Sequence, residues 1–549
     1  MPRHIPSSLH DVSFDVIVIG AGINGAGIAR DAVMRGLKVL LLDKGDVSSG
    51  TTSWSTRLIH GGLRYLEHRE VGLVRESLKE REVLLRIAPH LVRPLEFMIP
   101  IYADDKRGPN LVRLGMVAYD ALSVTKSLDH HKMLSPAEAL EREPGLTPEG
   151  LRGAAFYYDA QAEYPERLAL ENALDARRRG AAVVPYAEVV GLLRDGDRVT
   201  GVTFQDTLED GGRHSAAAPL VINAAGPWVD RILIESGDAE GDRRIGGTKG
   251  SHIVVDRFPG APREALYIEA DDGRPYFVVP WNELFLIGTT DKRYDGDLDR
   301  VVADETEVAY LIGETNRVIP EAGLTRDDVL YTYSGVRPLP HVEGGEDGIT
   351  RRHIIEDHAP EVEGLLTIVG GKITTYRSLA EQCVDKVFAK LERESVKCRT
   401  HKEPLPGGVG DMDAFREQFV ALSGLERRVA ERLVRIYGSR AIQVLDTVGD
   451  DPDLREPLDP ETGAIKAEVL FGFRVELAQN LADLMLRRTM VGMNSKVAVG
   501  ADEVAAEVAI RHLNWDEERA HAEVERYRSY ITRMTPRSLA EGSPAGSAA

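Results

Sequence analysis

The chain has only two cysteines, Cys383 and Cys398, among its 549 residues. Two cysteines exclude a disulfide-based scaffold and a cysteine-rich metal site, and their scarcity is typical of proteins of the reducing cytosol. The sequence also lacks an HExxH motif, so we expect no metal ion.

Long hydrophobic runs are absent as well. Residues 1–11 are polar and contain no apolar core of a secretory signal, and the apolar stretch at 16–23 is interrupted by glycines. A membrane-spanning helix needs about 18 or more consecutive apolar residues. We therefore expect a cytoplasmic protein whose contact with the inner face of the cell membrane, if it has one, is peripheral.

Positive charge is scarce: 68 Lys and Arg residues stand against 88 Asp and Glu residues, a net charge of −20. A field of this sign repels polyphosphate, which argues against nucleic acid as a partner. An anionic small substrate would therefore need a local group of cations. The 43% hydrophobic and 28% charged residues are those of a globular protein, and the length predicts about three domains.

The N-terminal region has the pattern of a βαβ unit. Residues 14–19 read as a buried parallel strand, 23–34 have helical spacing, and 38–42 read as a second buried strand. Strand, helix and strand follow one another within about thirty residues, the length of the unit that binds dinucleotides.

Three glycines and one acid give this unit its binding chemistry. Gly20, Gly22 and Gly25 form GxGxxG between strand and helix, and Asp43 follows the second strand. Gly20 permits the tight turn, Gly22 lets a pyrophosphate approach the backbone, and Gly25 lets helix and strand pack closely. The pyrophosphate would lie at the helix N-terminus and Asp43 would bind ribose hydroxyls.

The fingerprint alone leaves NAD and FAD open. Two later strands, at 220–226 and 365–371, end in small residues. Such junctions allow backbone to approach a second, larger part of a cofactor, which favours FAD, although two tight turns without a ligand would look the same.

Further motifs point to one family. They are the hydroxyl-rich run 48–57 with the following Leu-Ile-His-Gly-Gly-Leu-Arg-Tyr-Leu-Glu (58–67), Val-Ile-Asn-Ala-Ala-Gly-Pro-Trp (221–228), Gly-Ser-His-Ile-Val-Val (250–255), Ser-Gly-Val-Arg-Pro-Leu (334–339) and Gly-Gly-Lys-Ile-Thr-Thr-Tyr-Arg (370–377). Together with a helical C-terminal region, they resemble the FAD-dependent, aerobic (respiratory) glycerol-3-phosphate dehydrogenases over nearly the whole chain.

The resemblance implies a reaction and a cofactor. The family oxidises sn-glycerol 3-phosphate to dihydroxyacetone phosphate in glycerol catabolism, with hydride passing from C2 to N5 of FAD and electrons leaving to a membrane quinone. The nearest alternative is a glycerol-3-phosphate oxidase that uses oxygen and releases hydrogen peroxide, because both would share the same substrate residues. An amino-acid oxidase would need fewer cations, and an RNA-modifying flavoenzyme would need a basic face.

The resemblance also implies how the substrate is held. Arg337, Arg64 and Lys372 are expected to bind the phosphate, and Tyr65 and His252 the polyol end. Arginine forms bidentate hydrogen bonds to phosphate oxygens, whereas lysine supplies a point charge.

Three residues are the catalytic candidates. His60 is the first choice for the base that takes the C2 hydroxyl proton and His252 the second, because an unperturbed imidazole titrates near neutral pH. Arg337 is the third, since a nearby cation stabilises negative charge that develops on the reacting groups.

The expected cofactor contacts lie in the glycine turn, after the second strand and in the segments that carry the resemblance, with Val189 in addition. They are Gly20, Gly22, Ile23, Asn24, Gly25, Asp43, Lys44, Thr52, Ser53, Ser55, His60, Gly61, Gly62, Leu63, Val189, Ala224, Ala225, Gly226, Gly335, Arg337, Gly371, Lys372, Ile373 and Thr374.

The chain departs from the family at three positions. Asp43 stands where Glu is commoner, Arg57 where Lys is expected, and Trp54 where a small residue is usual. We expect Arg57, like Arg69 and Arg75, to be a solvated surface residue.

The predicted fold is α/β: a Rossmann-like FAD-binding domain interleaved with a substrate domain built on a mixed sheet, followed by an α-helical domain. The expected segments are 12–90, 150–245 and 330–400 for the FAD-binding domain, 91–149 and 246–329 for the substrate domain, 405–537 for the helical domain and 538–549 for a disordered tail. A homodimer is possible.

Peripheral membrane contact has one candidate segment. Residues 91–102 and 111–117 mix apolar and basic side chains, as an interfacial segment does. An ordinary core strand and helix would have the same composition, so both interpretations stay open.

Overall fold

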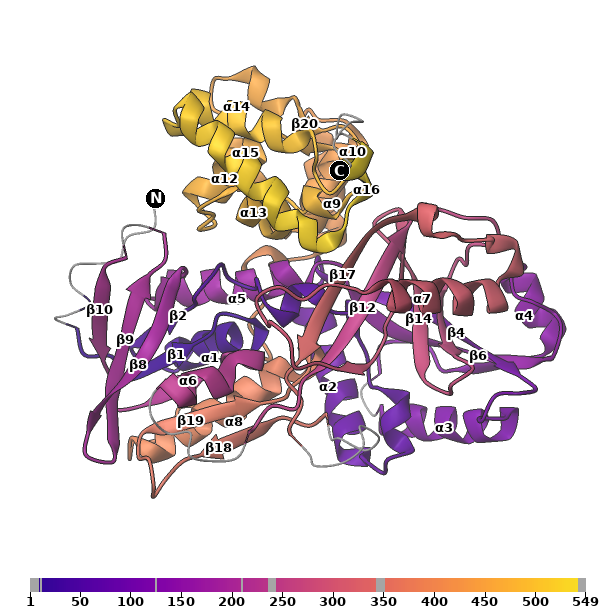
Figure 1. Cartoon of the computed structure of the whole chain (residues 1–549), viewed down its shortest axis with the longest axis horizontal. Coiled ribbons are helices and arrows are strands. Elements are labelled where there is room, and N and C mark those ends of the chain that lie inside the picture. The colour runs from indigo at the N-terminus through magenta and orange to yellow at the C-terminus, as the bar shows by residue number, and fades with distance from the viewer. Residues whose placement is uncertain are drawn as a thin grey trace, which may run out of the picture.

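A computed structural model describes residue 9 and residues 12–123, 126–208, 211–235, 243–341 and 351–541. Figure 1 shows two sheet-containing parts side by side, with the helices of the C-terminal domain on top of them. This is the predicted mixed α/β arrangement with a separate helical domain.

A six-stranded sheet forms the centre of the N-terminal part. Its order is β18-β19-β11-β1-β2-β7, with bounds Ile354–Asp357, Leu365–Val369, Val221–Asn223, Val16–Ile19, Val39–Leu42 and Ala182–Val184. β1 pairs in parallel with both β2 and β11, and every residue of β1 and β2 is buried. Buried strands of this kind are continuously apolar, as the sequence is here.

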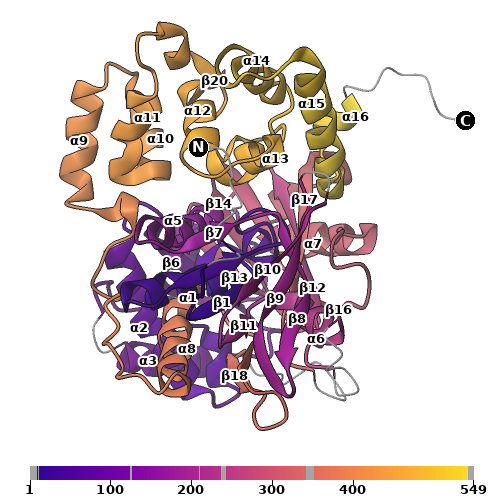
Figure 2. The same ribbon diagram turned by 90° about the vertical axis from the view of Figure 1, so that its left-hand side faces the viewer.

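Helices cover this sheet. α1 (Ile23–Met34) packs against α5 (Pro165–Arg178) and α8 (Tyr376–Lys390). A separate three-stranded sheet, β10-β9-β8, lies beside it (Arg213–Ala217, Arg198–Asp206, Ala187–Asp195), and Figure 2 shows these strands next to β1 and β11. The expected helix 23–34 agrees with α1 at both ends, and the expected strands begin two residues and one residue before β1 and β2.

A ten-stranded mixed sheet forms the other part. Eight strands follow the order β16-β12-β15-β14-β13-β4-β6-β3, while β17 pairs with β12 and β5 pairs with β6. Their bounds are Lys292–Arg293, Thr248–Val255, Leu284–Gly288, Pro275–Trp281, Ala265–Glu269, Val92–Tyr102, Leu151–Ala162, Leu58–Ile59, Val329–Arg337 and Lys132–Leu134. Helices α2 (Val71–Ile87), α3 (Pro109–Leu122), α4 (Pro136–Arg142) and α7 (Glu305–Val318) belong to this part, and the short α6 (Val229–Glu235) lies near β19.

Three strands lie in a different sheet from the one the expected segments imply. β3 falls within the expected range 12–90, yet it pairs with β6 in the mixed sheet. β6 falls within the ranges expected for the FAD-binding domain, and β17 does so except for its first residue, yet β6 pairs with β4 and β17 with β12 in the mixed sheet. Pairing between strands so distant in sequence depends on tertiary packing, which local patterns do not record.

The C-terminal domain is helical, as predicted. Its helices are α9 (Met412–Leu422), α10 (Arg427–Tyr437), α11 (Ala441–Asp446), α12 (Ala467–Arg474), α13 (Leu481–Asp483), α14 (Ala501–Leu513), α15 (Glu517–Ile531) and α16 (Arg537–Glu541), with the short strands β20 (Pro457–Asp459) and β21 (Ala464–Ile465) between them. The tail expected from residue 538 starts too early, because α16 includes 538–541. The rest of that tail, 542–549, lies outside the described residues.

The two parts of the candidate membrane segment have different environments. β4 is paired on both sides within the mixed sheet, and its last six residues are buried, so it is a core strand. α3 instead leaves Leu111, Leu114 and Val117 exposed. Within the described ranges, no helix is both long and apolar enough to cross a membrane.

Candidate active site

A cavity of about 630 Å³ runs between the two sheets and reaches the C-terminal domain. Its walls include the turn between β1 and α1, the end of β2, the 3₁₀ helix η2 (Thr51–Trp54), and the residues after β11 and β19. The carboxyl ends of parallel strands thus open into it, which is where ligands bind in open α/β sheets.

The glycine turn has the backbone conformation that a cofactor cradle needs. Gly20 has φ +100°, and a Cβ there would lie 2.6 Å from the Ala224 carbonyl oxygen. A Cβ on Gly25 would lie 1.8 Å from the Gly20 carbonyl oxygen, so only glycine fits. A Cβ on Gly22 would meet only the Thr52 hydroxyl, at 3.5 Å, because Gly22 faces the cavity. Gly22 therefore leaves space for a ligand, whereas Gly20 and Gly25 permit the fold itself.

Two side chains fix the start of α1. The Ile23 N–H donates to the Thr52 hydroxyl at 3.1 Å. Asp43 accepts from the backbone N–H groups of Ala21, at 2.6 Å, and of Gly45, at 2.9 Å. Burial raises the pKa of Asp43 to about 6. Asp43 thus joins the glycine turn to the loop after β2, at the end of the cavity expected to hold the adenosine.

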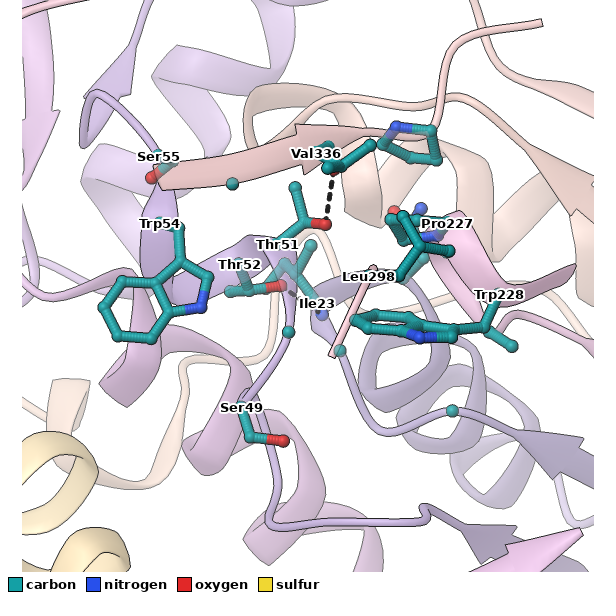
Figure 3. Close-up of a pocket in the computed structure, with 18 of the residues that line it drawn as sticks. Ile23, Ser49, Thr51, Thr52, Trp54, Ser55, Pro227, Trp228, Leu298 and Val336 are labelled. Carbon is teal, nitrogen blue, oxygen red and sulfur yellow. Dashed lines mark hydrogen bonds between the residues drawn. The ribbon is translucent and has the colours of Figure 1, made fainter. Parts of the chain in front are cut away.

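The hydroxyl-rich run contributes side chains that Figure 3 shows. Thr51 donates to the Val336 carbonyl oxygen at 2.7 Å, which ties η2 to β17 (Figure 3). Trp54 and Trp228 both line the cavity, and Trp228 lies near Leu298 in the same view. Neither Thr51 nor Trp228 is among the expected cofactor contacts, whereas Trp54 stands where the family usually has a small residue.

A group of cations lies where β17 ends. Arg337 donates to Asp291 at 3.0 Å and to the Thr289 hydroxyl at 3.0 Å, and Arg351 donates to the other oxygen of Asp291 at 3.2 Å. Although burial opposes it, the two arginines hold the pKa of Asp291 below its usual value. Arg351 was missed, although its place in an Arg-Arg-His run (351–353) was a visible signal.

Lys372 and Tyr65 lie against each other in the same region. The Lys372 ammonium is 3.7 Å from the centre of the Tyr65 ring and 3.4 Å from the Ser77 hydroxyl. Burial, followed by the charge of Arg351, lowers the pKa of Lys372 to about 7. An anion arriving beside this ammonium would raise its pKa again.

His252 stacks on Tyr333 with its ring centre 4.8 Å away, and its Nε2 lies 3.0 Å from the Thr56 hydroxyl. Its Nδ1 is buried and has no hydrogen-bond partner within the described part of the chain. Burial, and then the charges of Arg337 and Arg57, hold its pKa well below the usual value. The ring is therefore neutral at pH 7.

His60 lines the cavity near Lys372. Its backbone N–H donates to the Thr374 hydroxyl at 3.3 Å, and its ring meets the edge of Phe277 with centres 6.3 Å apart. Burial and the charge of Lys372 lower its pKa to about 4. This imidazole is therefore also neutral near pH 7.

Most of the predicted site residues line this one cavity. They are Gly20, Gly22, Ile23, Asn24, Asp43, Lys44, Thr52, Ser55, His60, Tyr65, Val189, Ala224, Ala225, Gly226, His252, Gly335, Arg337, Gly371, Lys372, Ile373 and Thr374. The remaining predicted residues are not among those that line it: Gly25, Ser53, Gly61, Gly62, Leu63 and Arg64. Ser53, for example, donates to the Ser48 carbonyl oxygen at 2.6 Å, and the Gly61 N–H donates to the Tyr119 hydroxyl at 2.8 Å.

The expectation that Arg57 is solvated is wrong. Its side chain is fully buried and forms two hydrogen bonds to Glu166, at 2.8 and 2.9 Å. It also lies 4.4 Å from the centre of the Trp281 ring. Arg69 and Arg75 are exposed. Glu166 is 109 residues from Arg57 in the sequence, so the pair was not visible there.

The cavity fits a large polar cofactor. Asn24 Oδ1, Trp228 Nε1 and His252 Nδ1 are buried side-chain atoms of lining residues, and none has a partner among the described residues. Buried polar groups are rarely left unpaired in proteins, so a ligand or water is expected to satisfy them. No cluster of three or more potential metal ligands occurs in the described portion of the chain.

Comparisons with known proteins agree with this geometry. The family model described as FAD dependent oxidoreductase matches residues 15–377, and that of the C-terminal domain of alpha-glycerophosphate oxidase matches residues 398–520. The chain is 46% identical to a glycerol-3-phosphate dehydrogenase of Synechocystis, over 96% of this chain and 98% of that protein. It is 36% identical to one of Mycobacterium leprae, over 94% and 88%.

A solved structure is similar along nearly the whole chain. The glycerol-3-phosphate dehydrogenase of Bacillus halodurans, complexed with FAD, has a TM-score of 0.79 and 29% identity and covers 99% of this chain and 98% of its own. FAD is thus the cofactor that the cavity is built to hold. The chain belongs to the family of FAD-dependent glycerol-3-phosphate dehydrogenases.

Proposed function

We propose that this protein oxidises sn-glycerol 3-phosphate to dihydroxyacetone phosphate and passes the electrons to a membrane quinone. The observation that carries the proposal is the group of Arg337, Arg351 and Lys372 around Tyr65, in the cavity that also contains two neutral histidines. Such a group of cations inside a protein of net charge −20 suits a small phosphate ester.

The phosphate is bound by the cations of this group. Arg337 and Arg351 present guanidinium groups that Asp291 holds in place, and Lys372 adds a point charge beside Tyr65. Arg64 directly precedes Tyr65, and its charge acts on the Tyr65 hydroxyl. We assign Arg64 a supporting electrostatic role in phosphate binding, and His252 with Tyr65 the polyol end.

His60 takes the C2 hydroxyl proton as hydride leaves C2. Its lowered pKa keeps the imidazole neutral, which a base requires, and Lys372 lies close enough to influence that pKa. His252 is the second candidate, because its Nδ1 is unpaired in the described structure. The charge of Arg337 stabilises the alkoxide that begins to form at C2.

FAD, when bound, supplies the acceptor for this hydride. Gly22 and the N-terminus of α1 would hold its pyrophosphate, and Asp43 with Val189 would hold its adenosine. The junctions after β11 and β19, including Ala225 and Gly371, line the cavity and would face the flavin half of the cofactor.

The electron acceptor distinguishes a dehydrogenase, which reduces a quinone, from an oxidase, which reduces oxygen. A quinone is dissolved in lipid, so a dehydrogenase must touch the bilayer, and we assign this contact to α3. Leu111, Leu114 and Val117 are 53%, 66% and 52% exposed and recur every three residues, and Arg113 on the same helix is also exposed. Helices of this composition lie in membrane interfaces. Figures 1 and 2 place α3 at the end of the molecule away from the C-terminal domain.

A flotation experiment tests this surface. The protein, made in the cytoplasm, should float with vesicles of cell-membrane lipids, and Leu114→Ser should reduce the floating fraction while leaving the reaction with a soluble acceptor unchanged. Equal flotation of the variant would contradict the assignment. A homodimer stays a prediction that sedimentation would test.

The alternative function is a glycerol-3-phosphate oxidase, favoured by the match of residues 398–520 to the C-terminal domain of alpha-glycerophosphate oxidase. Hydrogen peroxide yield per substrate oxidised, compared with reduction of a quinone analogue, separates the two. We expect the quinone analogue to be reduced and little peroxide to form; stoichiometric peroxide would favour the oxidase.

The reaction itself is tested by the visible spectrum. Anaerobic glycerol 3-phosphate should bleach the flavin band, and Arg337→Ala should raise KM and lower kcat because the variant loses both a phosphate ligand and a stabilising charge. An unchanged flavin band in the wild-type protein would contradict the proposed substrate, and unchanged kinetics of the variant would contradict the role of Arg337.

A further inference from the structure

The C-terminal domain forms part of the cofactor cavity. Six of its residues line the wall: Asn480, Ala482, Arg487, Arg526, Tyr530 and Arg533. Asn480 and Ala482 lie at the start of α13, which Figure 1 shows on the side of the C-terminal domain that faces the FAD-binding sheet.

Arg487 is the most deeply placed of these residues. Only 3% of its side-chain surface is exposed. Its Nε donates to Asp46 at 2.5 Å and its Nη2 donates to Asp483 at 2.8 Å. The remaining nitrogen, Nη1, is buried and has no partner among the residues that the structure describes. A buried guanidinium donor left unpaired is costly, so a ligand is expected there.

The position of Arg487 indicates which part of FAD it meets. Its partner Asp46 follows Asp43 by three residues, in the loop after β2. Asp483, its other partner, accepts from the Tyr186 hydroxyl at 2.6 Å, and Tyr186 directly precedes β8, which contains Val189. Arg487 therefore lies at the end of the cavity formed by Asp43 and Val189, where the ADP half of the cofactor belongs.

The neighbouring residue offers a natural comparison. Arg488 bonds both oxygens of the same Asp46, at 2.6 and 2.7 Å, and donates from Nε to the Glu476 carbonyl oxygen. All three of its nitrogens are thus paired, and it lies outside the cavity lining. Both arginines end the π-helical turn Leu484–Arg488, whose wider turn lets two consecutive side chains reach one carboxylate. Turns of this kind often occur at functional sites.

We propose that the C-terminal domain completes the FAD site and that Arg487 donates from Nη1 to an oxygen of the ADP half of FAD. The helical domain then has a direct role in retaining the cofactor. Because Arg487 also pairs with Asp46, cofactor binding is coupled to the ion pairs that join the C-terminal domain to the loop after β2.

The experiment compares Arg487→Met with Arg488→Met, both purified as the holoenzyme. FAD is then removed, and the affinities of each apoprotein for FAD and for FMN, which lacks the adenylate, are measured by quenching of flavin fluorescence. Because Arg487 meets the ADP half, Arg487→Met should weaken FAD binding at least tenfold relative to Arg488→Met and leave FMN binding equal in the two. Equal losses for FAD in both variants, or an equal loss of FMN and FAD in Arg487→Met, would overturn the proposal.

Arg487→Lys keeps the charge beside Asp46 and serves if the methionine variant does not fold. A lysine ammonium cannot donate hydrogen bonds to Asp46, Asp483 and the cofactor with the fixed geometry of a planar guanidinium. FAD should therefore dissociate from the Arg487→Lys holoenzyme at least several-fold faster than from the wild type, whereas Arg488→Lys should match the wild type. Wild-type release from Arg487→Lys would contradict the role of Nη1.

Discussion

The pKa of Lys372 leads to a quantitative prediction for substrate binding. Burial lowers this pKa from the ordinary value of about 10.4 to about 7, so the ammonium loses its proton across the neutral range. If the phosphate binds only the charged form, apparent KM scales with one plus the ratio of neutral to charged lysine. That factor is about 2 at pH 7 and about 100 at pH 9, a roughly 50-fold rise.

The direction of this pH dependence follows from the negative charge of the substrate phosphate. A bound phosphate restores the proton of Lys372, so binding takes up a proton above pH 7 and weakens as the pH rises. The histidines do not interfere, because the pKa of His60 is about 4 and that of His252 is also lowered. The substrate phosphate is a dianion above its second pKa, near 6, so its own charge is constant from pH 7 to 9.

The assay is the competitive inhibition constant of a non-oxidisable phosphate ester, measured from pH 7 to 9 alongside the KM of glycerol 3-phosphate. The wild-type values should rise together. Lys372→Arg should give a flat profile because arginine stays charged, and Lys372→Met should be flat but weak throughout. A rise in Lys372→Arg as steep as in the wild type would show that another group titrates, and would refute the reasoning.

Two further predictions concern the cofactor turn and the buried arginine. Gly22→Ala should keep the thermal stability of the apoprotein but weaken FAD binding at least tenfold, because its Cβ points into the cavity. Gly25→Ala should instead yield little folded protein. Calorimetry measures the stability and flavin fluorescence the FAD binding, and a stable Gly25→Ala variant would contradict the close contact with the Gly20 carbonyl oxygen. Arg57→Met should lower the free energy of unfolding by about 3–5 kcal/mol, because Glu166 is left buried without its partner. Denaturant unfolding should show this loss, whereas the control variant Arg75→Met, at an exposed position, should unfold like the wild type.

The sequence predicted the parts of the fold that local patterns determine. The first strand, helix and second strand were found to within two residues, because the apolar runs and the glycine turn signal them directly. Strand pairing across long separations was not predicted, as β6 and β17 show. Their sequences read equally well as strands of either sheet, and only packing decides between the two.

The residues of the site also divide into those that local sequence patterns predicted and those that they did not. Most of the residues identified by motif line one cavity, since each motif stands at the end of a strand or the start of a helix. Asp291 and Arg351 were missed because nothing in the sequence marks the ion pair between them, and Arg487 because its partner Asp46 belongs to another domain. Arg57 was misjudged, since its burial depends on Glu166, far away in the sequence.

The interleaving of the two sheets also sets the order of events during synthesis. The chain leaves the six-stranded sheet after β2 and returns for β7, leaves it for β8 to β10 and returns for β11. It then leaves for β12 and comes back only with β18 and β19. The wall formed by Gly371 to Thr374 is therefore missing until more than two thirds of the polypeptide has left the ribosome. The vitamin-derived cofactor can therefore complete its contacts only after these residues have been synthesised, and a product truncated before them would lack this wall.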